Sequence, residues 1–188
     1  SAGRLALLGG LRVALETEQL EVHYQPKVSL GAGGVIGVEA LVRWHHPELG
    51  EVAPAEFVPL AEECGLIDQL GLWVLRTACR EHQRWCRARA PVRLAVNLSA
   101  RQLRDAGLDG RVRAILDQTG TDPRWLELEL TEAALMQEGD ATAEMVARLD
   151  ALGIGLALDD FGTGTSSLSC LERFPIKRVK IDRAFVRQ

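Results

Sequence analysis

The chain has 188 residues, of which 47% are hydrophobic and 26% charged, and its formal net charge is -4 at pH 7. This length and composition are typical of one ordinary globular domain with a sizeable core. The negative balance argues against a nucleic-acid polymer as partner, but it leaves room for a small phosphorylated ligand bound with a metal. The sequence has no long apolar run and no signal peptide, so we expect a cytoplasmic domain without membrane insertion.

The hydrophobic pattern predicts strands and helices that alternate along the chain. A helix at 5–18 leads into strands at 20–30 and 35–44, a polar loop at 45–54, and helices at 54–65 and 67–89. Strands follow at 93–99, 126–131, 154–160 and 178–182, separated by helices at 103–118, 141–152 and 167–174, with a helix cap at Ser99 to Gln102. Such alternation implies βαβ units with parallel pairing.

Several of these strands carry polar residues on one parity, where strands of an α/β protein are normally apolar on both faces. The other parity is apolar. The polar positions are Glu39, Arg43, Asn97, Glu127, Glu129, Asp159, Lys180 and Asp182. Burying carboxylates costs several kcal/mol or more unless a cation or hydrogen bonds compensate. A row of carboxylates repeated on the inner face of successive strands therefore predicts a metal site.

The polar residues cluster at the C-terminal ends of the strands, where barrel enzymes place their active sites. An open doubly wound sheet would place a site there too, but the polar inner parity favours a TIM-like (βα)8 barrel. We find about six strands, whereas such a barrel needs eight. We therefore expect residues 1–188 to form a single domain that lacks its C-terminal strands, or one that another segment or chain completes.

The candidate ligands offer only oxygen, which suits Mg²⁺, Mn²⁺ or Ca²⁺ better than zinc or copper. Each has an ordinary alternative, such as a loop cap, but the joint pattern is harder to explain that way. Two divalent ions could activate water for phosphodiester cleavage, and Lys180 could hold that water or neutralise charge. Gln25 and Arg43 could contact a phosphate or base. His45 and His46 are set aside as a ligand pair, since adjacent strand residues point opposite ways.

Six motifs, in order and covering nearly the whole chain, resemble those of the EAL domain family. They are Tyr24-Gln25-Pro26, Glu39-Ala40-Leu41-Val42-Arg43-Trp44, Asn97-Leu98-Ser99, Glu129-Leu130-Thr131-Glu132, Asp159-Asp160-Phe161-Gly162-Thr163-Gly164 and Lys180-Ile181-Asp182. The resemblance implies a (βα)8-type barrel whose first strand is antiparallel. It also implies hydrolysis of cyclic di-GMP to linear pGpG, with Mg²⁺ or Mn²⁺, in bacterial second-messenger signalling.

The resemblance also assigns roles to individual residues. Lys180, Glu39 and Asp159 would form the catalytic group, with Lys180 assisting the catalytic water. Glu132 would anchor the loop at 160–167, which in the family couples metal binding to dimerisation. The metal ligands would be Glu39, Asn97, Glu129, Asp159 and Asp160, and the nucleotide site would be lined by Gln25, Leu41 and Arg43. A homodimer, attached to further signalling domains in a larger protein, is expected on the same ground.

Two departures from the family pattern are present. Thr165 stands where the family usually has Tyr, and the family's Glu on the seventh strand and its later Gln have no counterpart in the sequence. Because of the second departure, an inactive receptor that binds cyclic di-GMP and signals by dimerisation is an alternative function. A different Mg²⁺-dependent barrel enzyme, such as a lyase acting on a carboxylic acid, is a third interpretation, which the paired Asp159 and Asp160 disfavour.

Overall fold

The computed structural model describes residues 2–88, 90–136, 139–162 and 167–185, and their strands form one sheet. The strands are β1 (Leu20–Val28), β2 (Val35–His46), β3 (Gly50–Val52), β4 (Arg93–Asn97), β5 (Leu126–Thr131), β6 (Gly155–Phe161) and β7 (Arg178–Ile181). Their order is β1-β2-β4-β5-β6-β7, with β3 beside β2. β1 is antiparallel to β2, and the steps from β2 through β4, β5 and β6 to β7 are parallel. The predicted parallel pairing is confirmed.

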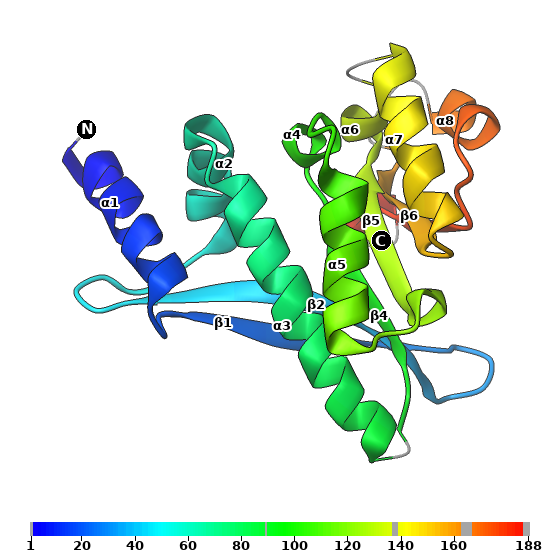
Figure 1. Ribbon diagram of the computed structural model, residues 1–188, viewed down its shortest axis with the longest axis horizontal. Helices are drawn as coiled ribbons and strands as arrows, with labels where there is room; N and C mark the ends of the chain where they lie inside the picture. The colour runs from blue at the N-terminus through cyan, green and yellow to red at the C-terminus, as the bar shows by residue number, and fades with distance from the viewer. Residues whose placement is uncertain (1, 89, 137–138, 163–166, 186–188) are drawn as a thin grey trace.

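The helices cover one side of this sheet. They are α1 (Ala2–Glu16), α2 (Pro54–Cys64), α3 (Ile67–Arg87), α4 (Ala100–Leu103), α5 (Leu108–Thr119), α6 (Glu132–Met136), α7 (Gly139–Ala151) and α8 (Ser167–Arg173), with short 3-10 turns at Pro123–Trp125 and Arg183–Phe185. Figure 1 shows α1, α2, α3, α5 and α7 following one another from blue to orange. The sheet and helix layers are those of a partial TIM-like barrel.

The core lies between the apolar parity of the strands and the helices. Ala40, Leu94, Leu128 and Leu156 are buried on the successive strands β2, β4, β5 and β6. α3 meets them with a stripe of apolar residues at helical spacing, Ile67, Leu70, Val74, Leu75, Ala78 and Cys79, all of them buried. Because this parity packs against helices, the opposite parity of the same strands is turned to the inner face of the sheet.

Local sequence signals set several of the helix boundaries. Ser99 and Gln102 form a reciprocal capping box that begins α4, as the sequence predicts. Gly65 ends α2 with a φ of +76°, a conformation that glycine adopts without strain. Other expectations were incomplete. The loop at 45–54 contains β3, the helix expected at 103–118 is two helices, α4 and α5, and α6 precedes the helix expected at 141–152.

The sheet is open within the described residues. β1 pairs there only with β2, and β7 only with β6, so the two edge strands do not meet each other. This agrees with the expectation of about six barrel strands, with β3 lying off that path. No helix in the described part of the chain is long and apolar enough to span a membrane.

Candidate metal centre and ligand pocket

Strand register places the predicted site residues at one level of the sheet. Gln25 lies opposite Glu39 across β1 and β2. Asn97 at the end of β4 is the partner of Glu129 on β5, and Asp159 on β6 lies two register pairs further along, opposite Thr131. Because the parallel strands end at the same edge, side chains that are more than a hundred residues apart in the chain converge there.

Three carboxylates and one ammonium group form the centre of this site. Oxygen atoms of Glu39, Glu129 and Asp159 lie within 4.8 Å of one another. The Nζ atom of Lys180 donates to Glu129 Oε2 at 2.6 Å, to Asp159 Oδ2 at 2.9 Å and to Glu39 Oε2 at 3.1 Å. Asn97 Nδ2 donates to Glu39 Oε1 at 2.9 Å. The ammonium group of Lys180 thus lies between three carboxylates.

The site perturbs the acidity of its members in opposite directions. Burial raises the pKa of Glu129, although hydrogen bonds from Lys180 and Lys27 act against it. Burial would raise the pKa of Glu39 too, but the hydrogen bond from Asn97 and the charge of Lys180 together lower it. Burial acts to lower the pKa of Lys180, yet its hydrogen bonds to Glu129 and Asp159 hold that pKa well above the usual range. Lys180 is therefore an ammonium ion at neutral pH.

The donor set fits a hard divalent cation. Three carboxylates meet the ammonium group of Lys180, and Lys27 reaches only Glu129 among them, so negative charge remains in excess within the cluster. All the converging acidic ligands are oxygen atoms, and the amide group of Asn97 is hydrogen-bonded to one of them, Glu39 Oε1. These acidic groups could hold a metal ion, as the parity of the strands predicts.

Asp160 has a different setting from the three clustered carboxylates. It has a φ of +54°, and its backbone N–H donates to Asp159 Oδ1 at 2.9 Å. Burial raises the pKa of Asp160, with further contributions from the neighbouring carboxylates of Asp159 and Asp182. A non-glycine residue in this left-handed region is uncommon and costs backbone energy, which is often met at functional sites. The structure thus places Asp160 next to the cluster, and its role as a ligand stays a prediction.

A second group of charges, Lys27, Glu127 and Arg178, lies one layer further from the strand ends, and the sequence identified only Glu127 among its members. Lys27 on β1 donates to Glu129 Oε1 and also lies 3.4 Å from Glu127 Oε1. Arg178 on β7 is paired with the other oxygen of Glu127. Two features of the sequence could have pointed to Lys27: it is one of only three lysines, and it lies two residues from Gln25 and so on the same face of β1.

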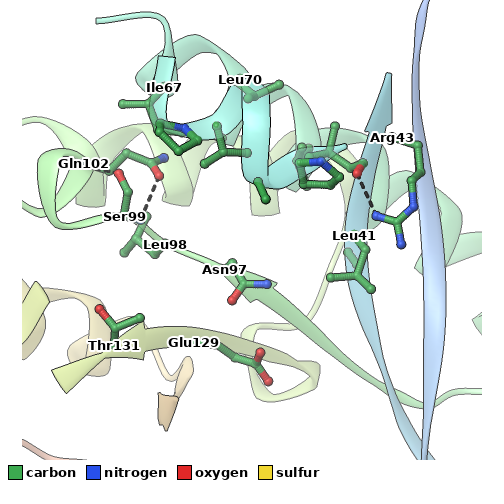
Figure 2. Close-up of a pocket in the computed structure, with 18 residues that line it drawn as sticks. Leu41, Arg43, Ile67, Leu70, Asn97, Leu98, Ser99, Gln102, Glu129 and Thr131 are labelled. Carbon is green, nitrogen blue, oxygen red and sulfur yellow. Dashed lines mark hydrogen bonds between the residues drawn. The ribbon is translucent and has the colours of Figure 1, made fainter. Parts of the chain in front are cut away.

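A pocket of about 430 Å³ opens beside the carboxylate cluster. Asn97 and Glu129 lie at one side of it, and Leu41 and Arg43 from β2 line another (Figure 2). Arg43 Nη1 donates to the carbonyl of Val42 at 2.9 Å. Apolar side chains of α2 and α3 form the remaining wall, including Pro54, Val58, Pro59, Ile67, Leu70 and Val74. Sequence reasoning missed this wall because its residues look like ordinary helix core.

The structure brings most of the predicted site residues together, with two exceptions. Gln25 lies opposite Glu39 but is not among the described residues that line the pocket. Glu132 is buried at the first position of α6. The loop that Glu132 was expected to anchor includes residues 163–166, among them Thr165, which lie outside the described residues.

The comparison with protein families decides which family these motifs represent. The model of the EAL domain matches residues 9–188 of the chain. The chain belongs to the EAL domain family. The expected resemblance is thereby confirmed over nearly its whole length, and the open sheet is that of an EAL-type barrel.

Curated relatives of this EAL domain include named enzymes of cyclic di-GMP metabolism. The chain is 48% identical over 186 residues to the bifunctional diguanylate cyclase/cyclic di-GMP phosphodiesterase MucR of Pseudomonas aeruginosa, covering 98% of this chain and 27% of MucR. It is 49% identical over 184 residues to the cyclic di-GMP phosphodiesterase NbdA of the same species, covering 94% of this chain and 23% of NbdA. The chain therefore spans about a quarter of the length of these relatives.

Solved structures agree with the sequence relatives. The structure titled PaMucR phosphodiesterase, c-di-GMP complex, superposes with a TM-score of 0.91 at 49% identity, over 96% of this chain and 74% of that one. The FimX EAL domain from Pseudomonas aeruginosa bound to c-di-GMP superposes with a TM-score of 0.87 at 28% identity, over 97% and 73% of the two chains. The fold of this domain is thus one that other members use with cyclic di-GMP bound.

Proposed function

We propose that this EAL domain hydrolyses cyclic di-GMP to the linear dinucleotide pGpG in a reaction that depends on Mg²⁺ or Mn²⁺. The observation that carries the proposal is the convergence of Glu39, Glu129 and Asp159 on Lys180, beside a pocket of about 430 Å³. Relatives named cyclic di-GMP phosphodiesterases support the choice of nucleotide. The presence of the upstream ligand set, including Asp159, Asp160 and Lys180, favours an enzyme over an inactive receptor.

Glu39, Asn97, Glu129 and Asp159 would hold the cation, joined by Asp160. Their oxygen donors suit Mg²⁺ or Mn²⁺, and the excess negative charge of the cluster matches a divalent ion. When bound, such an ion supplies Lewis-acid stabilisation of the charge that develops as a phosphodiester is cleaved. In this proposal, Glu39 and Asp159 are catalytic residues because they would hold the cation at the phosphodiester that is cleaved.

Lys180 acts as a hydrogen-bond donor in this proposal. Its raised pKa keeps the proton on Nζ near neutral pH, so Lys180 is unsuited to act as a base. The ammonium group can orient the attacking water by donating a hydrogen bond and can offset negative charge on the phosphate. Its contacts to three carboxylates hold Nζ at the centre of the site before substrate arrives.

Substrate contacts come from the pocket wall of β2 and from β1. Arg43 offers a guanidinium group to a phosphate or a base edge, and Leu41 offers an apolar surface to a base. The apolar side chains of α2 and α3 favour a flat ring over a charged group on their side of the pocket. Gln25, opposite Glu39, would contact the part of the nucleotide nearest the cation.

The test is hydrolysis of cyclic di-GMP by the 188-residue chain with Mn²⁺, followed by chromatography of pGpG. Glu39→Gln should lower turnover by at least about 100-fold, since it removes a charge from the cluster. Glu51→Gln is a matched control, because Glu51 is exposed on β3 of the same hairpin. Tight binding of the nucleotide without turnover in the wild type would contradict the enzyme and favour the receptor.

We also propose that this domain works in the cytoplasm as a homodimer within a larger signalling protein, with Glu132 anchoring the loop at 160–167. The greater length of the named relatives supports attachment to other domains. Light scattering of the purified chain, with and without Mn²⁺, tests the dimer. A monomer under both conditions at micromolar concentration would refute dimerisation through this domain.

A further inference from the structure

A second group of metal-ligating side chains lies on the β1–β2 ribbon, outside the site described above. Glu21 and His23 come from β1, and His45 comes from β2. One ligand atom from each of these three residues lies within 4.8 Å of the other two. His46, the neighbour of His45, contacts the Trp44 ring and accepts backbone hydrogen bonds from Glu48 and Leu49. Sequence reasoning set both histidines aside, but the structure places His45 beside Glu21 and His23 and His46 beside Trp44.

Strand register explains why these three residues meet. Glu21 and His23 are two residues apart on β1, so their side chains leave the same face. The backbone N–H of His45 donates to the carbonyl of Gln19 at 2.9 Å, which fixes β2 so that His45 lies diagonally across from Glu21. Cross-strand diagonal neighbours are within reach of long side chains. The ribbon thus presents two imidazoles and one carboxylate from a paired, regular backbone.

The separations are those of ligands around an ion. Glu21 Oε2 lies 3.4 Å from His23 Nε2 and 3.6 Å from His45 Nε2. Good N–H···O hydrogen bonds are about 2.7–3.2 Å long. Tetrahedral Zn²⁺ with bonds of about 2.0–2.2 Å sets its ligand atoms roughly 3.3–3.6 Å apart. Both contacts to Glu21 are therefore near the spacing of coordinated atoms and long for direct hydrogen bonds.

The surroundings leave this carboxylate available. Arg43 is the register partner of Glu21, but its Nη1 donates to the carbonyl of Val42. Within the described ranges, the ion pairs of Glu21 are those with His23 and His45, and none involves lysine or arginine. The side chains of His23, Glu21 and His45 are 53%, 57% and 48% exposed, so an ion and its completing water can enter.

We propose that Glu21, His23 and His45 form a binding site for a transition-metal ion of the Zn²⁺ type. The two imidazoles give this site a nitrogen-containing donor set, whereas the cluster of Glu39, Glu129 and Asp159 offers carboxylate oxygen. Mg²⁺ therefore prefers the carboxylate cluster, and Zn²⁺ or Co²⁺ prefers the ribbon site. His23 is two residues from Gln25 on β1, about 7 Å along the strand, so the ion would add positive charge to the same inner face.

The test is titration of the 188-residue chain with Co²⁺ in the presence of excess Mg²⁺. Four-coordinate Co²⁺ absorbs visible light far more strongly than octahedral Co²⁺, so the spectrum reports the ribbon site without any activity measurement. We expect one equivalent with the strong band, displaced by Zn²⁺. His23→Ala, His45→Ala and Glu21→Gln should each weaken binding by at least about tenfold, with unchanged far-ultraviolet circular dichroism.

His46→Ala is the matched control, because it removes a neighbouring imidazole whose contacts lie elsewhere, and it should leave the band intact. Glu39→Gln should also leave the band intact, which separates this site from the proposed catalytic centre. A band that survives His23→Ala and His45→Ala, or one that disappears with Glu39→Gln, would overturn the proposal. Absence of any strong band in the wild type would overturn it as well.

Discussion

Glu127 and Glu129 stand two residues apart on β5, face the same side of the sheet and are both buried, yet they have different neighbours. Glu127 is paired with two cations, Lys27 and Arg178. Glu129 contacts Lys27 and Lys180, and Lys180 also contacts Glu39 and Asp159. Positive charge is therefore in excess around Glu127, whereas negative charge is in excess in the cluster to which Glu129 belongs.

The difference shows how one strand can carry both a structural and a functional carboxylate. A carboxylate that is already paired with cations has no electrostatic need for a metal ion, and removing it leaves those cations without their partner. A cluster that brings like charges together is costly, and a cation can relieve that cost. We therefore expect substitutions of Glu127 to change mainly the stability of the fold, and substitutions of Glu129 to change mainly metal binding and turnover.

The largest expected effect is the loss of turnover when Glu129 is substituted. Glu129→Gln keeps the shape of the side chain but removes a charge from the cluster, so turnover of cyclic di-GMP should fall by about 100-fold or more. The metal-free free energy of unfolding should change by less than about 1 kcal/mol, because the lost lysine contacts are offset by relief of repulsion and desolvation. Initial rates across a Mn²⁺ series, together with urea unfolding, measure both. Near-normal turnover of the Glu129→Gln variant would contradict the functional role assigned to Glu129.

Glu127→Gln should give the reverse pattern. The substitution leaves Lys27 and Arg178 with one charge fewer to pair with, and both cations are partly exposed, so the cost is expected at about 1–3 kcal/mol. Turnover should stay within about threefold of the wild type, since the converging group consists of Glu39, Glu129 and Asp159 and does not include Glu127. Urea unfolding gives the stability change. A 100-fold loss of turnover without loss of stability would assign Glu127 to the functional layer instead.

Lys27 bridges the two layers and gives the smallest expected effect. Removing its charge with Lys27→Met leaves the Glu129 side of the cluster more negative, so Mn²⁺ should bind about three- to tenfold more tightly. Lys27→Arg preserves the charge and serves as the control, with affinity near that of the wild type. Isothermal titration calorimetry with Mn²⁺ compares the variants. Weaker Mn²⁺ binding by Lys27→Met would mean that Lys27 positions Glu129 more than it opposes the ion.

The sequence by itself predicted the order of the six main strands, most of the helices, the parallel pairing and the group of Glu39, Asn97, Glu129, Asp159 and Lys180, but not β3, α6 or the division between α4 and α5. A period of two along a strand reports which face a side chain leaves, and parallel strands end at one edge of a sheet. Those two regularities suffice to bring a row of strand-end residues together. The motifs then identified the EAL family, and the comparisons confirmed it.

Only the tertiary structure decided which side chains touch. Cross-strand register joined Lys27 to both Glu127 and Glu129, and it set His45 beside Glu21 and His23, contacts that periodicity within one strand cannot specify. Packing of α2 and α3 over β2 created the pocket wall from residues that look like ordinary core. The positive φ of Asp160 likewise depends on its surroundings, because a non-glycine residue keeps that conformation only where the rest of the fold compensates its cost.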